Sequence, residues 1–147
     1  MIRMTLFRQT QFAEFEAEAH AMAERGEPLN KDNLSALYYD LNKKYYGEGA
    51  VHDRDIEIEW ARIPHFYNAF YVYKYATGIT AAIAISDKII KEGAPAVERY
   101  FAFLRGGCSK DPVTLLKEAG ADLTSKATFE AAMQQFADAL EEFTSLS

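Results

Sequence analysis

One histidine followed by four tyrosines is the part of this sequence best suited to chemistry. The histidine is His65, and the tyrosines stand at positions 67, 71, 73 and 75. On a single helix, this spacing would place several phenolic hydroxyls close to one imidazole. A buried hydroxyl without a hydrogen-bond partner costs roughly 1–3 kcal/mol, a cost that leucine would avoid. N–H and O–H donors gathered beside a groove suit two tasks, binding a peptide backbone and stabilising an oxyanion.

The spacing of the tyrosines predicts which of them point the same way. Tyr67 and Tyr71 are four residues apart and are expected on one helix face. Tyr75 continues that face, whereas Tyr73 lies on another face and is expected to pack. A tyrosine hydroxyl has a pKa of about 10, so it remains a hydrogen-bond donor at neutral pH. The alternative for His65 is a capping or core histidine at the start of a helix.

A second group of polar side chains lies near the N-terminus. Glu14, Glu16, Glu18 and His20 include possible metal ligands, and Glu16 and His20 are four residues apart. The acidic residues spread around a helix, however, and two-metal bundle sites take a Glu-x-x-His motif from each of two helices. We therefore interpret this segment as a solvated acidic face.

Helical periodicity runs through every long segment of the chain. Gly26 and Pro28 end the first predicted helix, Asn30 is expected to cap the second and Gly47 to end it, and Ser125 is expected to cap the last. The predicted helices cover residues 6–25, 31–46, 64–91, 95–104, 113–118 and a C-terminal segment after 125, whose apolar stripe is Phe129, Met133, Phe136, Leu140 and Phe143.

Residues 47–63 break this pattern, because isoleucine and tryptophan alternate there with acidic residues. No partner strand is evident, so we expect an extended connector. The long helix over 64–91 is expected to bury Phe66, Phe70, Ile83 and Ile85. Together these elements predict an all-α protein, a single helical bundle of about six helices that forms one domain over residues 1–147.

Composition narrows the class of protein. Of 147 residues, 49% are hydrophobic and 26% charged, which is typical of a soluble globular chain. A net charge of −6 without a basic cluster argues against nucleic-acid binding. The single cysteine, Cys108, excludes an internal disulfide and fits a reducing cytosol. Asn68 and Lys74 interrupt the apolar run over 66–86, so we expect no membrane span.

The sequence around the histidine resembles a known family. The strings Trp-Ala-Arg-Ile-Pro-His-Phe-Tyr at 60–67 and Phe-Tyr-Val-Tyr-Lys-Tyr-Ala-Thr-Gly at 70–78 are similar to the C-terminal region of oligoendopeptidase F, a zinc metallopeptidase of the thimet-oligopeptidase type. Segments 5–16, 103–107 and 115–123 and the string Tyr-Tyr-Gly at 45–47 fit as well. The resemblance covers nearly the whole chain.

The resemblance implies a cytoplasmic enzyme that hydrolyses oligopeptides with zinc. In this family a His-Glu-x-x-His helix and a later glutamate hold the metal, and that motif lies upstream of the region resembled here. The motif is absent from this sequence. We therefore expect zinc in the full-length parent only, no metal ligands or bound cofactor in this chain, and no peptidase activity from this chain alone.

The resemblance also implies roles for individual residues. His65, Tyr67 and Tyr71 are the expected catalytic donors to the substrate and the transition state. The residues themselves add four expected substrate contacts: Arg62, Tyr75 on the face of Tyr71, and two loop glycines, Gly106 and Gly107, which would let a peptide backbone approach closely.

Some of these roles have alternatives. Arg62 suits a substrate carboxylate, but pairing with Asp55 or Glu59 inside the protein is the competing interpretation, because buried charges are normally paired. For the glycine loop the competing interpretation, a flexible turn between two helices, is the one that the sequence favours.

Two other classes of function stay open for the chain. One is a non-catalytic helical module that binds peptides or partner proteins through its tyrosine face, and the other is a structural remnant without a ligand. Truncation of a parent would expose apolar surface, which normally marks an interface. We therefore expect self-association through a face that includes some of Phe7, Phe12, Tyr67 and Tyr71.

Overall fold

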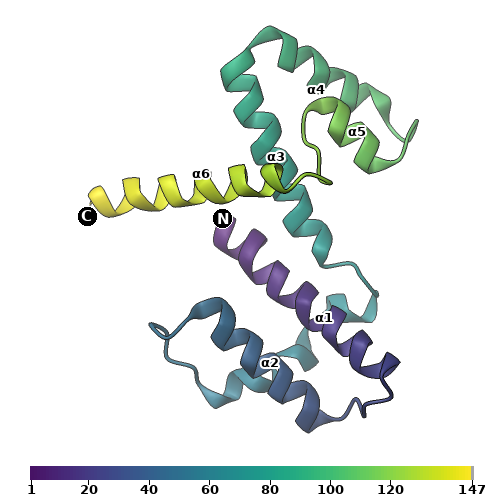
Figure 1. Ribbon diagram of the computed structural model, residues 1–147, viewed down its shortest axis with the longest axis vertical. Helices are drawn as coiled ribbons and strands as arrows, with labels where there is room; N and C mark the ends of the chain where they lie inside the picture. The colour runs from purple at the N-terminus through teal and green to yellow at the C-terminus, as the bar shows by residue number, and fades with distance from the viewer. Residues whose placement is uncertain (147) are drawn as a thin grey trace. The chain divides into compact units, whose positions relative to one another are not determined.

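The computed structural model describes residues 1–146, and these residues contain helices and no β-strand (Figure 1). This confirms the predicted all-α class. The α-helices are α1 (Arg8–Glu24), α2 (Lys31–Tyr46), α3 (Tyr73–Glu92), α4 (Ala94–Gly106), α5 (Pro112–Ala119) and α6 (Lys126–Ser145). Three shorter elements accompany them: the π-helix η1 (Arg3–Phe7) and the 3₁₀ helices η2 (Arg54–Arg62) and η3 (Pro64–Tyr67).

The chain divides into two compact units, Met1–Ala76 and Thr77–Ser147. Each unit has a hydrophobic core of its own. The expectation of one domain over the whole chain stays a prediction.

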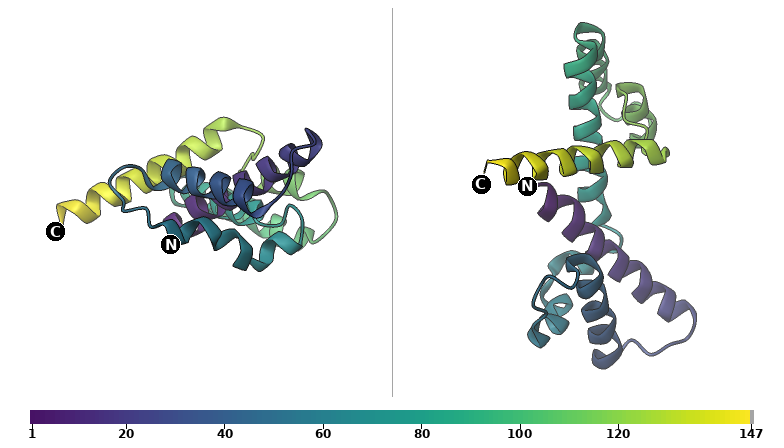
Figure 2. Two further views of the ribbon diagram at one scale, coloured as in Figure 1. Left: turned by 90° about the horizontal axis from the view of Figure 1, so that it is seen from below. Right: turned by 60° about the vertical axis from the view of Figure 1, so that its left-hand side comes forward.

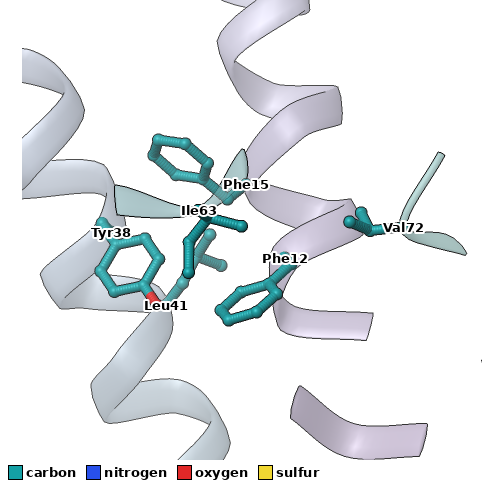
Figure 3. Close-up of a cluster of buried hydrophobic side chains, with 6 residues drawn as sticks. All are labelled: Phe12, Phe15, Tyr38, Leu41, Ile63 and Val72. Atoms are coloured by element: carbon teal, nitrogen blue, oxygen red, sulfur yellow. The ribbon is translucent and has the colours of Figure 1, made fainter. Parts of the chain in front are cut away.

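Aromatic side chains dominate the core of the first unit (Figure 3). Phe12 and Phe15 of α1 pack against Tyr38 of α2, and the rings of Phe15 and Tyr38 meet edge to face with centroids 5.3 Å apart. Leu41, Ile63 and Val72 complete the cluster. Phe12 is only 4% exposed, so it is not available to the expected association face, and self-association itself stays a prediction.

The caps of α2 follow the sequence prediction. The side chain of Asn30 accepts a hydrogen bond from the backbone N–H of Asn33 at 2.9 Å, which satisfies one of the free donors at the helix start. Gly47 ends the helix with φ of 69°, a left-handed conformation that glycine adopts without steric cost. Ser125 precedes α6 but makes no side-chain capping bond, so the capping role predicted for it is wrong.

Residues 54–62 form a 3₁₀ helix and not the predicted extended connector. Asp53 starts it by accepting a hydrogen bond from the N–H of Asp55 at 3.0 Å. Side chains three residues apart lie in line on a 3₁₀ helix, so Ile56, Glu59 and Arg62 form one row. Ion pairing of the buried Glu59 explains why an acidic residue lies on the inner side of this segment.

The predicted helix over 64–91 is interrupted. It consists of η3, a turn over residues 68–72, and α3. Within the part of the chain described, Phe70 is the one non-glycine residue with positive φ, at 56°. The prediction that Phe70 is buried is therefore wrong, because the turn carries its side chain outward to 50% exposure. Ile85 is buried as predicted, and Phe66 and Ile83 are half-buried.

The second unit has a smaller core, formed by Ala81 and Ile85 of α3 with Ala119, the last residue of α5, and Ala121, which follows that helix. Figure 2 shows α6 as one unbroken helix, as its apolar stripe predicted. Part of that stripe faces solvent in the structure, since Leu140 is 53% and Phe143 68% exposed. Among the helices described, none has the length and apolarity that a bilayer span requires.

Candidate active site

His65, Tyr71 and Tyr75 form a hydrogen-bonded cluster in the first unit. The hydroxyl of Tyr75 lies 3.3 Å from Nε2 of His65 and 3.3 Å from the hydroxyl of Tyr71. The rings of His65 and Tyr71 are nearly parallel, with centroids 5.7 Å apart. The ring of Tyr75 meets both edge-on, at 5.6 and 5.5 Å. All three side chains are half-buried, so they remain within reach of a ligand.

The turn over 68–72 brings these three residues together. His65 comes from η3, Tyr71 from the turn itself, and Tyr75 from the first turn of α3. The chain therefore folds back between the histidine and the tyrosines, which a continuous helix would not do. The result places Tyr75 at the centre of the cluster, a position that the helical interpretation did not foresee.

The order of proton donation in the cluster follows from its hydrogen bonds. The hydrogen bond with Tyr71 raises the pKa of Tyr75 above its ordinary value, as expected when Tyr75 is the donor of that bond. The single proton of Tyr75 is then committed to Tyr71, so the contact with His65 is a hydrogen bond in the tautomer that carries the imidazole proton on Nε2. In this assignment Tyr71 keeps its own O–H for a ligand. A neutral donor held in this way is suited to an oxygen that gains negative charge.

The sequence predicted Tyr67 and Tyr71 on one helix face, and the structure does not place them so. Tyr67 belongs to η3, and its side chain is 88% exposed. Its role as a donor to substrate stays a prediction. Tyr73 is 48% exposed, so it is less buried than a packing residue would be.

Two residues of α1, Glu16 and His20, contact the turn at Phe70. The backbone N–H of Phe70 donates to Oε1 of Glu16 at 2.7 Å, and the ring of His20 lies against the ring of Phe70 with centroids 4.5 Å apart. Glu16 is only 6% exposed, so the interpretation of this segment as a solvated acidic face is wrong for Glu16. Its spacing of four residues from Phe12 was the signal in the sequence, because that spacing places it on the apolar face of α1.

Arg62 forms an ion pair with Glu59, which confirms the internal pairing considered from the sequence. Glu59 also accepts hydrogen bonds from Arg8 at 2.5 Å and from Tyr38 at 2.6 Å. Burial raises the pKa of Glu59, but these hydrogen bonds and the charges of both arginines outweigh burial and hold the pKa below its usual range. Since the side chain of Arg62 is 72% exposed, a further contact with substrate stays a prediction.

The loop glycines lie in the second unit. Gly106 is the last residue of α4, and Gly107 follows it with φ of 51°. A side chain at Gly106 would come within 3.2 Å of the Leu115 side chain, so close helix packing by itself explains this glycine. Binding of substrate by Gly106 and Gly107 stays a prediction.

Residues 1–146 contain no group of three or more His, Cys, Asp or Glu side chains placed to hold a metal ion. The cluster around His65 consists of one imidazole and two phenols, which is not a set of zinc ligands. The described residues therefore do not fit a zinc site of their own, and the chemistry of the cluster is that of hydrogen-bond donors.

Comparison with known proteins gives one consistent result. Residues 1–135 match the Peptidase family M3. The sequence is 54% identical to Oligopeptidase PepF of Bacillus subtilis over 98% of this chain and 22% of that protein. It is 41% identical to the chromosomal Oligoendopeptidase F of Lactococcus lactis subsp. cremoris over 98% of this chain and 24% of that protein.

Comparison with solved structures points to the same family. The crystal structure of oligoendopeptidase-F from Enterococcus faecium matches with a TM-score of 0.94 and 46% identity, over 98% of this chain and 28% of that chain. The chain thus spans about a quarter of the length of the relatives that it matches.

Proposed function

Because the chain belongs to Peptidase family M3, we propose that it forms part of a zinc-dependent endopeptidase that hydrolyses oligopeptides in the cytoplasm. The observation that carries this proposal is the hydrogen-bonded series from His65 through Tyr75 to Tyr71. We assign this series to the transition state of peptide hydrolysis, where the carbonyl oxygen of the scissile bond becomes an oxyanion.

The chain's own residues have the following roles in the proposal. Tyr71 donates its O–H to the developing oxyanion, and His65 holds that phenol in place through Tyr75. A donor aimed at charge that develops during the reaction binds the transition state more tightly than the ground state. Tyr67 and Arg62 contribute contacts to the bound peptide, as do Gly106 and Gly107.

The zinc ion of such an enzyme would polarise the scissile carbonyl and activate water. The described residues of this chain do not form a site for it, so we assign its ligands to other parts of the parent protein. We accordingly propose that the 147-residue chain alone cleaves no oligopeptide. Prolonged incubation with an oligopeptide mixture and zinc, followed by mass spectrometry, tests this, and any zinc-dependent cleavage would contradict it.

Steady-state kinetics of the full-length protein test the role of the cluster. We expect Tyr71→Phe and His65→Phe each to lower kcat by about 10²-fold, the typical effect of losing one oxyanion donor, while KM changes little. Zinc content stays at the wild-type level, since neither side chain is proposed as a ligand. Tyr73→Phe is the matched control and keeps wild-type kcat. Wild-type turnover in Tyr71→Phe, or a larger loss in Tyr73→Phe, would refute the assignment.

Self-association of the isolated chain is a second part of the proposal. Large apolar side chains exposed in the second unit support it, among them Ile90 at 80% and Phe143 at 68% exposure, because exposed apolar surface favours association. Light scattering at rising concentration tests it. A monodisperse monomer at the highest concentration reached would contradict it.

A further inference from the structure

We propose that Glu16 and His20 are positioning residues, which hold the turn at Phe70 so that Tyr71 presents its hydroxyl to the substrate. This inference rests on the proposed function of Tyr71. Glu16 and His20 are distant in sequence from the cluster, and the inference assigns both of them a role in turnover.

The backbone at Phe70 is the reason that the turn needs support. A bulky residue with positive φ is a genuine outlier, and such a conformation persists only where the surroundings enforce it. The φ of 56° at Phe70 directs the chain immediately before Tyr71. A return of Phe70 to negative φ would rotate the following peptide and move the phenol of Tyr71 away from Tyr75.

Glu16 enforces this conformation through the backbone. Its carboxylate accepts the N–H of Phe70 at 2.7 Å, across 54 residues of sequence. Glu16 is 6% exposed, so the carboxylate has little access to water and a hydrogen bond from the protein is its compensation for burial. Geometry of this kind favours one orientation of the Phe70 peptide over the alternatives.

His20 enforces the same conformation through the side chain. It lies one helical turn after Glu16 on α1, and its ring stacks on Phe70 at a centroid distance of 4.5 Å with 33° between the planes. The side chain of Phe70 is half exposed, so this stacking is a specific contact and not part of the buried core. One helix therefore holds both the backbone and the side chain of the same strained residue.

Substitutions at Glu16 in the full-length protein separate positioning from general stability. Glu16→Met keeps the length of the side chain but cannot accept the N–H of Phe70, and we expect kcat to fall about tenfold, since a misplacement of about 1 Å can cost up to 10²-fold. Glu16→Gln keeps an acceptor oxygen and should restore most of the turnover. Glu18→Met changes an exposed acidic residue of the same helix and is the control, with wild-type kcat expected.

The double variant Glu16→Met with Tyr71→Phe gives a readout that a merely structural role would not move. Because Glu16 acts through Tyr71, its loss should lower kcat no further once the Tyr71 hydroxyl is gone. Full additivity of the two effects would overturn the inference. So would wild-type turnover in Glu16→Met beside a large loss in Tyr71→Phe, whereas an inert Tyr71→Phe would instead remove the proposed function itself.

His20 supplies a second test that does not depend on a buried substitution. His20 is exposed, so His20→Ala is expected to fold, to lower kcat severalfold and to speed amide exchange in a peptide covering residues 66–74. His20→Phe keeps an aromatic ring against Phe70 and should restore both. Unchanged exchange and unchanged kcat in His20→Ala would overturn the role of His20.

Discussion

The imidazole of His65 and the phenol of Tyr71 lie nearly parallel, with 13° between their planes, and are linked through the hydroxyl of Tyr75. The two rings come from different segments, one from η3 and one from the turn before α3. The link is therefore a product of the fold, and its consequences can be measured residue by residue.

Removal of the linking hydroxyl should have an intermediate effect. In Tyr75→Phe the donor on Tyr71 remains, but it loses the hydrogen bond that orients it. We expect kcat of the full-length protein to fall about tenfold, less than the loss of about 10²-fold from removing the oxyanion donor itself. Tyr100→Phe in the second unit is the control. A loss equal to that of Tyr71→Phe would assign the donor role to Tyr75 instead.

Breaking the ion-pair network under η2 should destabilise the fold. Glu59 is buried and binds Arg8 and Tyr38, so Glu59→Gln leaves the charge of Arg8 without its partner. Loss of one member of a buried pair typically costs about 3 kcal/mol or more of unfolding free energy. Glu57→Gln removes only a long ion pair with the exposed Arg54, and should cost less than about 0.5 kcal/mol. Equal urea midpoints for the two variants would contradict the account.

The same carboxylate predicts how stability depends on pH. Its pKa in the folded state lies below the ordinary value of a glutamate side chain, so the folded state binds the proton less tightly than the unfolded state. The stabilisation is therefore present above the unfolded pKa and is lost as pH falls through the folded value. Urea unfolding at several pH values between 6 and 3 should show a decline that is shallower in Glu59→Gln. An equally steep decline in that variant would exclude Glu59 as a source.

The capping residues give a direct comparison within one protein. Asn30→Ala removes the hydrogen bond to the N–H of Asn33 and should cost about 1 kcal/mol of unfolding free energy. Ser125→Ala removes no side-chain capping bond and should stay within about 0.5 kcal/mol of wild type. Urea unfolding measures both variants. A larger loss of unfolding free energy in Ser125→Ala than in Asn30→Ala would contradict this assignment.

Most helices could be predicted from the sequence, and α2 is the clearest case, because its apolar periodicity, its N-cap Asn30 and its C-cap Gly47 are all local signals. The 3₁₀ helix η2 and the turn at Phe70 could not. Both depend on contacts between residues more than 50 positions apart, from Arg8 to Glu59 and from Glu16 to Phe70. Local residue propensities do not predict such contacts.

The same long-range contacts explain the outcome for the candidate site. A continuous helix would place Tyr67 and Tyr71 on one face near His65. In the structure the turn brings Tyr75 to that position instead, and its hydroxyl contacts both His65 and Tyr71. The residue types of the site were therefore apparent from the sequence, but their arrangement required the structure.

The most direct test of the central claim compares binding of a transition-state analogue with binding of substrate in the full-length protein. A phosphinic peptide presents a tetrahedral, negatively charged centre in place of the scissile carbonyl. If Tyr71 donates to the oxyanion, Tyr71→Phe should weaken binding of this analogue by the same factor, about 10²-fold, by which it lowers kcat/KM. The affinity for an uncleaved substrate peptide should be nearly unchanged. Equal weakening for substrate and analogue, or no weakening for either, would contradict the claim.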